Sequence, residues 1–430
     1  MNRHEHSLPK EKGLDRSLQM LREGYTFIRN RENKFDSPVF ESKLLGEKAY
    51  CMIGEEAAEV FYDNKKFRRA DAAPKAVEKT LFGEGGVQGL DGKSHRKRKR
   101  MFLSLMTPES LDEIQSMTRS VWEKYIGKWE GKEEIILYEE AKRIAAETAL
   151  TWSGVPFEEE NIEEWADQLS DLFEKAAEVS FSHFHSRRSR SKAESWVEDL
   201  VDEIRKGNKK VADDRPVSVV SFHRDHDGQW LDLHTAAVEI LNVIRPITAV
   251  SVYITFLGLA VHDFPEEVEK VRQGSEEERK RFIQEVRRYY PFFPFVVARV
   301  DQEFQWQGAK FEEGTLTLLD LYGTNHHPDL WKNPETFSPD RFHDWKGTPF
   351  RFIPQGGGDH ETGHRCAGEW ITLRMMDESL RMLVDGMDYE FPEQDVTYQM
   401  NEIPSLPNSG MRISHVKALK GKEDEDVSLD

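Results

Sequence analysis

The sequence predicts a mainly helical protein with a small β portion, and three observations lead to that prediction. Residues 109–285 are rich in Glu, Lys, Ala and Leu, which favour helices, and loops are expected only near 153–156 and 209–216. Residues 236–261 form one long apolar run that contains only two charged side chains, Glu239 and Arg245. Alternation of apolar and polar residues, which is typical of strands, is confined to short segments outside this helical region.

The other elements follow in chain order. Two β-like runs at 40–45 and 48–53 precede a helical pattern at 55–62. Residues 304–319 alternate about Gly308 and Gly314, which predicts a hairpin. A helix is expected at 370–384, and short β-like pieces between 389 and 417. Because no linker or break in composition divides the 430 residues, we expect one domain, 1–430, whose acidic tail at 420–430 is typical of disorder.

The apolar run at 236–261 is long enough to cross a membrane. However, Arg245 and Pro246 lie in its middle, where a charge costs about 3 kcal/mol or more. We therefore expect a buried helix, opened or kinked at Pro246, and no membrane span. The first forty residues lack an apolar signal segment, and Cys51 and Cys366 give no disulfide framework, so a cytoplasmic location is expected.

The overall charge argues against a nucleic-acid partner. Lys and Arg number 60 against 79 Asp and Glu, for a net charge of −19, whereas a surface that binds phosphates must be basic. The strongest basic run, 93–100, places His95 and Lys99 four residues apart on one helix face, which suits an anion site. The alternatives for this run are a solvated charged face, or a nuclear-import or nucleic-acid patch.

Cys366 lies in the most informative motif of the chain. A glycine-rich loop ends in His364-Arg-Cys-Ala-Gly and leads into the expected helix. A helix N-terminus and the basic neighbours lower a thiol pKa, and the resulting thiolate serves as a nucleophile, a metal ligand or a haem ligand. Positions two apart do not face each other on a helix, so His364 is a poor catalytic partner. Zinc lacks a second thiol nearby, and three consecutive glycines argue against an inert buried cysteine.

Arg245 needs an anion inside an apolar wall, because a buried guanidinium stays charged. Glu239 is six positions away and faces another side of the helix. The partner is therefore a distant carboxylate of this chain, which the residues alone favour, or a ligand carboxylate held by two parallel hydrogen bonds. Glu285 and Arg288 are three apart and can also pair, although most pairs of this kind lie on the surface.

Three motifs, in this order, resemble the cytochrome P450 haem-thiolate superfamily, and the resemblance covers nearly the whole chain. They are Glu285-x-x-Arg288, Phe337-Ser-Pro-Asp-Arg341-Phe342 and His364-x-Cys366-x-Gly368. The resemblance implies the P450 fold, a salt bridge that Arg341 shares with Glu285 and Arg288, and haem b held through iron by Cys366. The thiolate then donates electron density to the iron.

Two departures from the usual P450 pattern resemble one branch, the bacterial fatty-acid peroxygenases and the decarboxylases that make terminal alkenes. Asp359 stands seven residues before the cysteine, where phenylalanine is usual, and the loop is lengthened. Ile244-Arg-Pro-Ile stands where the central helix usually has an acid–alcohol pair. The resemblance implies these site residues: Arg245, Gln88 and Pro246 for catalysis; Arg69, His95, Lys99 and His364 for the haem propionates; Phe82 and Pro246 for the distal wall; Phe292 and Phe293 for the acyl channel.

The resemblance implies hydroxylation of long-chain fatty acids at the α and β carbons, driven by hydrogen peroxide, without an obligatory redox partner. The substrate carboxylate, bound by Arg245, then supplies the acid–base function that the helix lacks. Alkene-forming relatives carry histidine at the position of Gln88, and a neutral amide cannot donate a proton as imidazolium can, so decarboxylation is the alternative. A reductase-fed monooxygenase and a non-catalytic haem sensor are less favoured, the first because of Arg245 and Pro246, the second because a sensor has no use for a carboxylate anchor.

Overall fold

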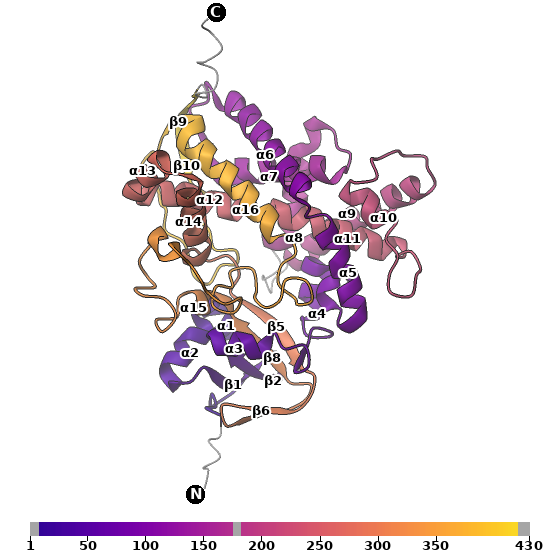
Figure 1. Ribbon diagram of the computed structural model, residues 1–430, viewed down its shortest axis with the longest axis vertical. Coiled ribbons are helices and arrows are strands. Elements are labelled where there is room, and N and C mark those ends of the chain that lie inside the picture. Colours follow the sequence, from indigo (N-terminus) through magenta and orange to yellow (C-terminus); the bar gives the residue numbers. More distant parts are fainter. Residues whose placement is uncertain (1–7, 175–181, 420–430) are drawn as a thin grey trace, which may run out of the picture.

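The computed structural model describes residues 8–174 and 182–419, so the tail at 420–430 lies outside the described residues. A sheet and the first helices form one end of the molecule, and long helices form most of the rest (Figure 1). The helices are α1 (Ser17–Glu23), α2 (Phe27–Phe35), α3 (Glu55–Phe61), α4 (Lys75–Val77), α5 (Gly92–Ser104), α6 (Pro108–Trp129), α7 (Leu137–Ser153), α8 (Ile162–Glu174), α9 (Ser182–Arg205), α10 (Pro216–Ser221), α11 (Leu233–Thr248), α12 (Val250–Asp263), α13 (Pro265–Gln273), α14 (Glu276–Tyr289), α15 (Leu321–Asn325) and α16 (Glu369–Arg381).

The strands form three small sheets, so the mainly helical prediction with a small β portion is confirmed. The largest sheet has the order β1 (Val39–Leu44), β2 (Glu47–Met52), β8 (Leu316–Asp320), β5 (Phe295–Val300), β3 (Phe67–Arg68). The second has the order β4 (Glu134–Ile136), β10 (Arg412–Ala418), β9 (Met387–Glu390), and the third pairs β6 (Phe304–Trp306) with β7 (Ala309–Phe311).

The hairpin predicted at 304–319 is only partly correct. β6 and β7 form the hairpin around Gly308, whereas β8 leaves it and pairs in parallel with β2 and antiparallel with β5. All five residues of β8 are buried, so its alternating sequence pattern did not reflect one solvent-exposed face. β4 was also missed, because its three residues stand within a long helical region.

Local sequence explains where the principal helices begin. Thr107 caps α6 by accepting from the Ser110 N–H, and Pro108 occupies the first helical turn. Asp232 caps α11 through the Thr235 N–H at 2.9 Å. Acidic residues fill the first turn of α14 and arginines its last turn, which complements the helix dipole.

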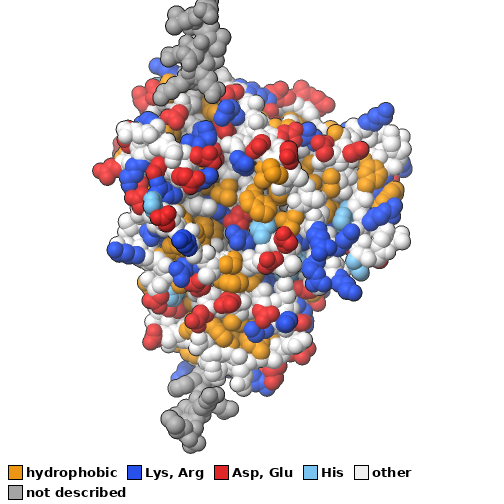
Figure 2. Space-filling model, viewed as in Figure 1, with side chains coloured by type: hydrophobic (Ala, Val, Ile, Leu, Met, Phe, Trp, Pro, Cys, Tyr) orange, Lys and Arg blue, Asp and Glu red, His pale blue; other side chains and the backbone are white. Residues whose placement is uncertain are grey.

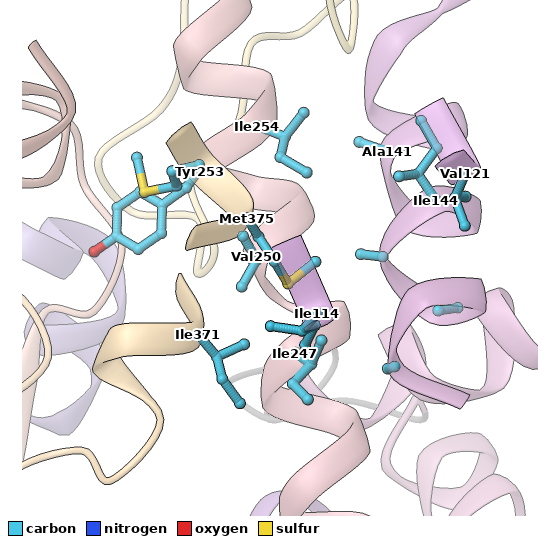
Figure 3. Packing of buried hydrophobic residues seen from close by; sticks show 14 of the residues in the cluster. Ile114, Val121, Ala141, Ile144, Ile247, Val250, Tyr253, Ile254, Ile371 and Met375 are labelled. Atoms are coloured by element: carbon cyan, nitrogen blue, oxygen red, sulfur yellow. The ribbon is translucent and has the colours of Figure 1, made fainter. Parts of the chain in front are cut away.

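The long apolar run is buried, as expected, and forms α11 and α12. The two helices are separated at Ala249, three residues after Pro246, where ψ opens to −11°. Among the described residues this one stretch, Leu233–Asp263, is long and apolar enough to cross a membrane, but nearly all of its most apolar window is buried inside the protein. Figure 3 shows Ile371 and Met375 of α16 on one side of α11 and α12, and Ala141 and Ile144 of α7 on the other.

The Glu285–Arg288 pair lies in the core instead of on the surface. Both side chains are fully buried, and the Arg288 guanidinium donates to both Glu285 oxygens at 2.8 Å. Arg341 Nε also lies 3.0 Å from Glu285, and the Ser338 N–H donates to the same carboxylate at 2.8 Å. Glu285 therefore joins α14 to the segment around residue 340, as the resemblance implied.

We expect Glu285→Ala to destabilise the protein strongly, because it leaves a buried arginine without its partner. Breaking a buried pair in this way costs about 3–5 kcal/mol. Glu276→Ala, on the same helix, removes an exposed pair with Lys280 and serves as the control. Urea unfolding followed by circular dichroism measures both changes, and equal shifts of the two midpoints would contradict the central role of Glu285.

Candidate haem-thiolate and carboxylate site

The glycine-rich loop brings Cys366 to the N-terminus of α16 by crossing close to Tyr62. Gly356 and Gly358 have φ of 88° and 85°, and a Cβ on Gly356 would stand 2.9 Å from the Tyr62 hydroxyl. The Cys366 N–H donates to the Gln355 carbonyl at 3.2 Å, which closes the loop. Cys366 and the Gln355 side chain are thus neighbours, with Sγ 3.9 Å from Nε2.

The expectation that basic neighbours lower the pKa of Cys366 is wrong for the protein chain by itself. Burial raises the thiol pKa, and Glu369 adds to that rise, whereas the Gly368 N–H, Lys99 and Arg287 lower it by smaller amounts. His364 and Arg365 were assigned this role from their proximity in sequence. In the structure Arg365 pairs with Glu369 at 2.7 Å instead.

Four residues expected at the haem propionates lie close together in the structure. The rings of His95 and His364 stack, with centroids 3.9 Å apart. Lys99, one turn after His95 on α5, donates to the Arg365 carbonyl. Arg69 is buried beside them, and its Nη1 has no hydrogen-bond partner among the described residues.

The electrostatics of this cluster fit a group with anionic substituents. Burial and the neighbouring cations lower the pKa of His95 to about 3, that of His364 to about 4 and that of Lys99 to about 8. The Asp91 carboxylate accepts from the backbone N–H groups of Arg69 and Ala70 and lies 3.6 Å from the His364 ring. Both histidines are then neutral at pH 7, so Arg69 and Lys99 are the cations that can pair with two propionates, and the neutral imidazoles can donate hydrogen bonds.

The run at 93–100 has two faces: the outer one is a solvated charged face, and the anion site on the inner one stays a prediction. His95, Arg98 and Lys99 point into the protein, whereas Lys93, Arg96, Lys97 and Arg100 are exposed. Figure 2 shows blue side chains gathered on the surface where Figure 1 places α5. Arg98, which was not singled out from the sequence, donates to Glu239 and to Asp225 at 2.6 Å each.

Ion pairing separates the buried arginines into two groups. Seven arginines are buried among the described residues, and five of them have a carboxylate partner: Arg31, Arg98, Arg190, Arg287 and Arg288. Arg69 and Arg245 are the two for which the described part of the chain offers none. They belong to the two clusters where the sequence predicts anionic groups.

Arg245 lies on α11 in surroundings that favour an anion. Its side chain is buried, and Nη1 has no partner among the described residues. Burial, with the nearby Arg190 charge, lowers the pKa of Arg245 to about 9. The described residues include no carboxylate that pairs with Arg245, so the salt bridge to a distant carboxylate, which the residues alone favoured, is not found among them. Glu239 faces another side of α11, as predicted, and pairs with Arg98.

Gln88 is held against the same helix by Asn242. Asn242 Nδ2 donates to Glu239 at 2.9 Å and to Gln88 Oε1 at 3.2 Å. Because a carboxylate only accepts, Glu239 fixes which end of the Asn242 amide carries nitrogen, and Asn242 in turn fixes the Gln88 amide. Sequence reasoning missed Asn242, although its spacing of three from both Glu239 and Arg245 places it between them on the helix.

The apolar residues expected around the site lie on three separate segments. Phe82 ends the π-helical turn Glu78–Phe82, whose Thr80 and Leu81 carbonyls accept from Arg190. Pro246 is half-buried in α11. Phe292 stacks on Tyr253 of α12, with ring centroids 4.2 Å apart, and Phe293 packs instead against the core of the five-stranded sheet. Their roles in the distal wall and the acyl channel stay predictions.

Comparisons with known proteins agree with this site. The sequence model of the cytochrome P450 family matches residues 280–412. The structure of cytochrome P450EX alpha (CYP152N1) with myristic acid is 46% identical, with a TM-score of 0.93 over 96% of this chain and 99% of that chain. Cytochrome P450SP alpha (CYP152B1) with (R)-ibuprophen is 40% identical, with a TM-score of 0.92 over 94% and 99%. A variant of OleT with arachidonic acid is 35% identical, with a TM-score of 0.93 over 97% and 100%.

The chain therefore belongs to the cytochrome P450 family of haem-thiolate oxidoreductases. Within that family its solved neighbours are CYP152 proteins, the branch of fatty-acid peroxygenases and decarboxylases. Its cofactor is haem b with a thiolate on the iron. The fold and the cofactor predicted from the resemblance are thereby confirmed.

We expect the reduced holoprotein with carbon monoxide to show the red-shifted Soret band of a thiolate-ligated haem. Cys366→Ser should abolish that band, because it removes the predicted thiolate. Cys51→Ala is the matched control, since Cys51 is the other cysteine and is buried in the sheet core. A red-shifted band that survives in Cys366→Ser would contradict the assignment of Cys366 as the ligand.

Proposed function

We propose that this protein is a fatty-acid peroxygenase that hydroxylates long-chain fatty acids at the α and β carbons with hydrogen peroxide. One observation carries the proposal: Arg245 is buried and has no carboxylate partner among the described residues. A guanidinium in that state needs an anion, and the carboxylate of a fatty acid matches it bidentately. The whole chain, 1–430, would act as one haem-thiolate unit in the cytoplasm, without an obligatory redox partner.

The ligands of the related structures support a carboxylate at Arg245. Myristic acid, (R)-ibuprophen and arachidonic acid are all carboxylic acids, and they are named in complexes with three different CYP152 proteins. With the carboxylate fixed, the adjacent Cα and Cβ are the carbons held most closely in place. Positioning of this kind favours reaction at those carbons over the rest of a flexible chain.

The central helix offers no free acid–base group of its own beside Arg245. The Glu239 carboxylate is occupied by Arg98 and Asn242. The Thr248 hydroxyl donates back to the Ile244 carbonyl at 3.1 Å. A substrate carboxylate on Arg245 therefore supplies the acid–base function that these residues do not, and binding of the substrate completes the site.

The proposed reaction converts R–H and H₂O₂ to R–OH and H₂O. Bound haem b, with the Cys366 thiolate on its iron, supplies the oxidising chemistry. The carboxylate held by Arg245 takes the proton from one peroxide oxygen and returns it to the other oxygen, which leaves as water. Arg69, His95, Lys99 and His364 would hold the propionates, and Phe82 and Pro246 would limit access of water to the distal side.

Oxidative decarboxylation is the second candidate, and Gln88 bears on it. That reaction converts R–CH₂–CH₂–COOH and H₂O₂ to a terminal alkene, CO₂ and two water molecules. Gln88 accepts from Asn242, which stands three residues before Arg245 on α11, but its amide is neutral and cannot supply a proton. Hydroxylation is therefore proposed as the principal route.

We expect Arg245→Leu to abolish peroxide-driven turnover of myristic acid while haem stays bound. Loss of a buried charge-assisted partner costs about 3 kcal/mol or more, so kcat/KM should fall at least about a hundred-fold. Arg245→Lys keeps the charge but loses the two-pronged donor and should retain intermediate activity. Products are measured by gas chromatography, and turnover at the wild-type rate in Arg245→Leu would overturn the carboxylate anchor.

We expect Gln88→His to raise the fraction of terminal alkene relative to hydroxy acid, because imidazolium can donate a proton. Gln88→Met serves as the control, since it removes the amide without adding a proton donor. The product ratio is measured after single incubations with myristic acid and peroxide. A ratio that is unchanged in Gln88→His, or raised equally in Gln88→Met, would eliminate proton donation at residue 88 as the selector.

A further inference from the structure

Gln355, and not Asp359, lies beside the cysteine in the structure. Asp359 is the residue that stands seven positions before Cys366, where the usual P450 loop has its phenylalanine. Asp359 is exposed, and its carboxylate closes a surface turn by accepting from the Glu361 and Thr362 N–H groups at 3.1 and 2.7 Å. Gln355 precedes Cys366 by eleven residues, because the lengthened loop bulges between them. The Cys366 N–H bonds to the Gln355 carbonyl, so the two residues meet at the neck of the loop.

The orientation of the Gln355 amide is determined by its partners. Arg287 Nη2 lies 2.8 Å from one end of the amide, and an arginine only donates, so that end must be the oxygen. The NH₂ group is then at the other end. There it faces the Thr372 hydroxyl at 3.1 Å and Cys366 Sγ at 3.9 Å, within the longer hydrogen-bond reach of sulfur.

Arg287 is itself held rigidly. Its side chain is buried, pairs with Glu369 at 2.5 Å and donates to Gln284 at 2.6 Å. Glu369, in the first turn of α16, also binds Arg365 at 2.7 Å. The neighbours of the amide are therefore fixed by ion pairs on two helices, and the NH₂ group cannot turn away without breaking the hydrogen bond from Arg287 to the amide oxygen.

We propose that Gln355 donates a side-chain hydrogen bond to the Cys366 thiolate in the haem-bound protein and so limits the electron donation of that ligand to iron. A hydrogen bond to a ligand sulfur withdraws charge from it, weakens the iron–sulfur bond and raises the reduction potential of the metal. Thr372 competes for the same NH₂ group. Gln355 is thus a positioning residue that acts through Cys366, and Thr372 opposes its effect.

Two variants of residue 355 separate hydrogen bonding from packing. Gln355→Met keeps the length of the side chain without any N–H. Gln355→Glu keeps the acceptor for Arg287 and loses the donor. We expect both to raise the Fe–S stretching frequency of the ferric holoprotein in resonance Raman spectra and to shift its reduction potential to more negative values. If residue 355 only fills space, the two variants should resemble the wild type.

Thr372→Val provides a test of opposite sign. Loss of the hydroxyl removes the competing acceptor, so the amide turns more fully to the sulfur. The Fe–S frequency should fall and the reduction potential should become more positive. A shift in the same direction as Gln355→Met, or no shift, would overturn the proposal, and this variant keeps the test decisive if the substitutions at 355 fail to retain haem.

These readouts do not depend on the proposed reaction. They require haem ligated by the cysteine, which the carbon monoxide spectrum verifies for each variant beforehand. Failure of fatty-acid turnover with normal Fe–S shifts would count against the peroxygenase proposal alone. Normal turnover without any Fe–S shift in the three variants would count against the role of Gln355 alone.

Discussion

A guanidinium that leaves water must meet a negative charge or acceptor groups, and this requirement organises the molecule. Glu285 joins α14 to Arg341, Glu239 joins α11 to Arg98 of α5, and Glu369 joins α16 to Arg287. Each pair connects segments far apart in the sequence, so each also fixes how the helices surround the site. Breaking one of them would leave a buried charge whose cost exceeds that of most single contacts.

The same requirement predicts an anionic partner for the two buried arginines that have no carboxylate partner among the described residues. Five buried arginines have a carboxylate partner, whereas Arg69 and Arg245 have none among the described residues. Those two lie where anionic groups of the cofactor and of a fatty acid are expected. The same electrostatic requirement therefore stabilises the scaffold where it is met internally and creates binding sites where it is not.

The sequence predicted the helical character, the buried central run and the cysteine motif, because these depend on local pattern and on short spacing. It did not predict β5 or the departure of β8 from the hairpin, which depend on strand pairing between distant segments. The pKa of Cys366 was predicted with the wrong sign, because burial outweighs nearby cations. Gln355 and Asn242 were missed for a related reason, because their roles depend on the residues that the fold places beside them. In addition, the lengthened loop puts Gln355 further from Cys366 in sequence than the usual spacing of the motif.

Two neutral amides, those of Gln88 and Gln355, share one arrangement. Near Gln88, Glu239 accepts from Asn242, and Asn242 donates to the side-chain oxygen of Gln88. Near Gln355, Glu369 pairs with Arg287, and Arg287 donates to the side-chain oxygen of Gln355. In both cases the glutamine NH₂ is directed away from its support, because the oxygen is already bound. An amide does not titrate, so its hydrogen-bond pattern stays the same over the pH range in which histidines change charge. The substrate's own carboxylate would then be the group beside Arg245 that gains and loses a proton, as the proposed reaction requires.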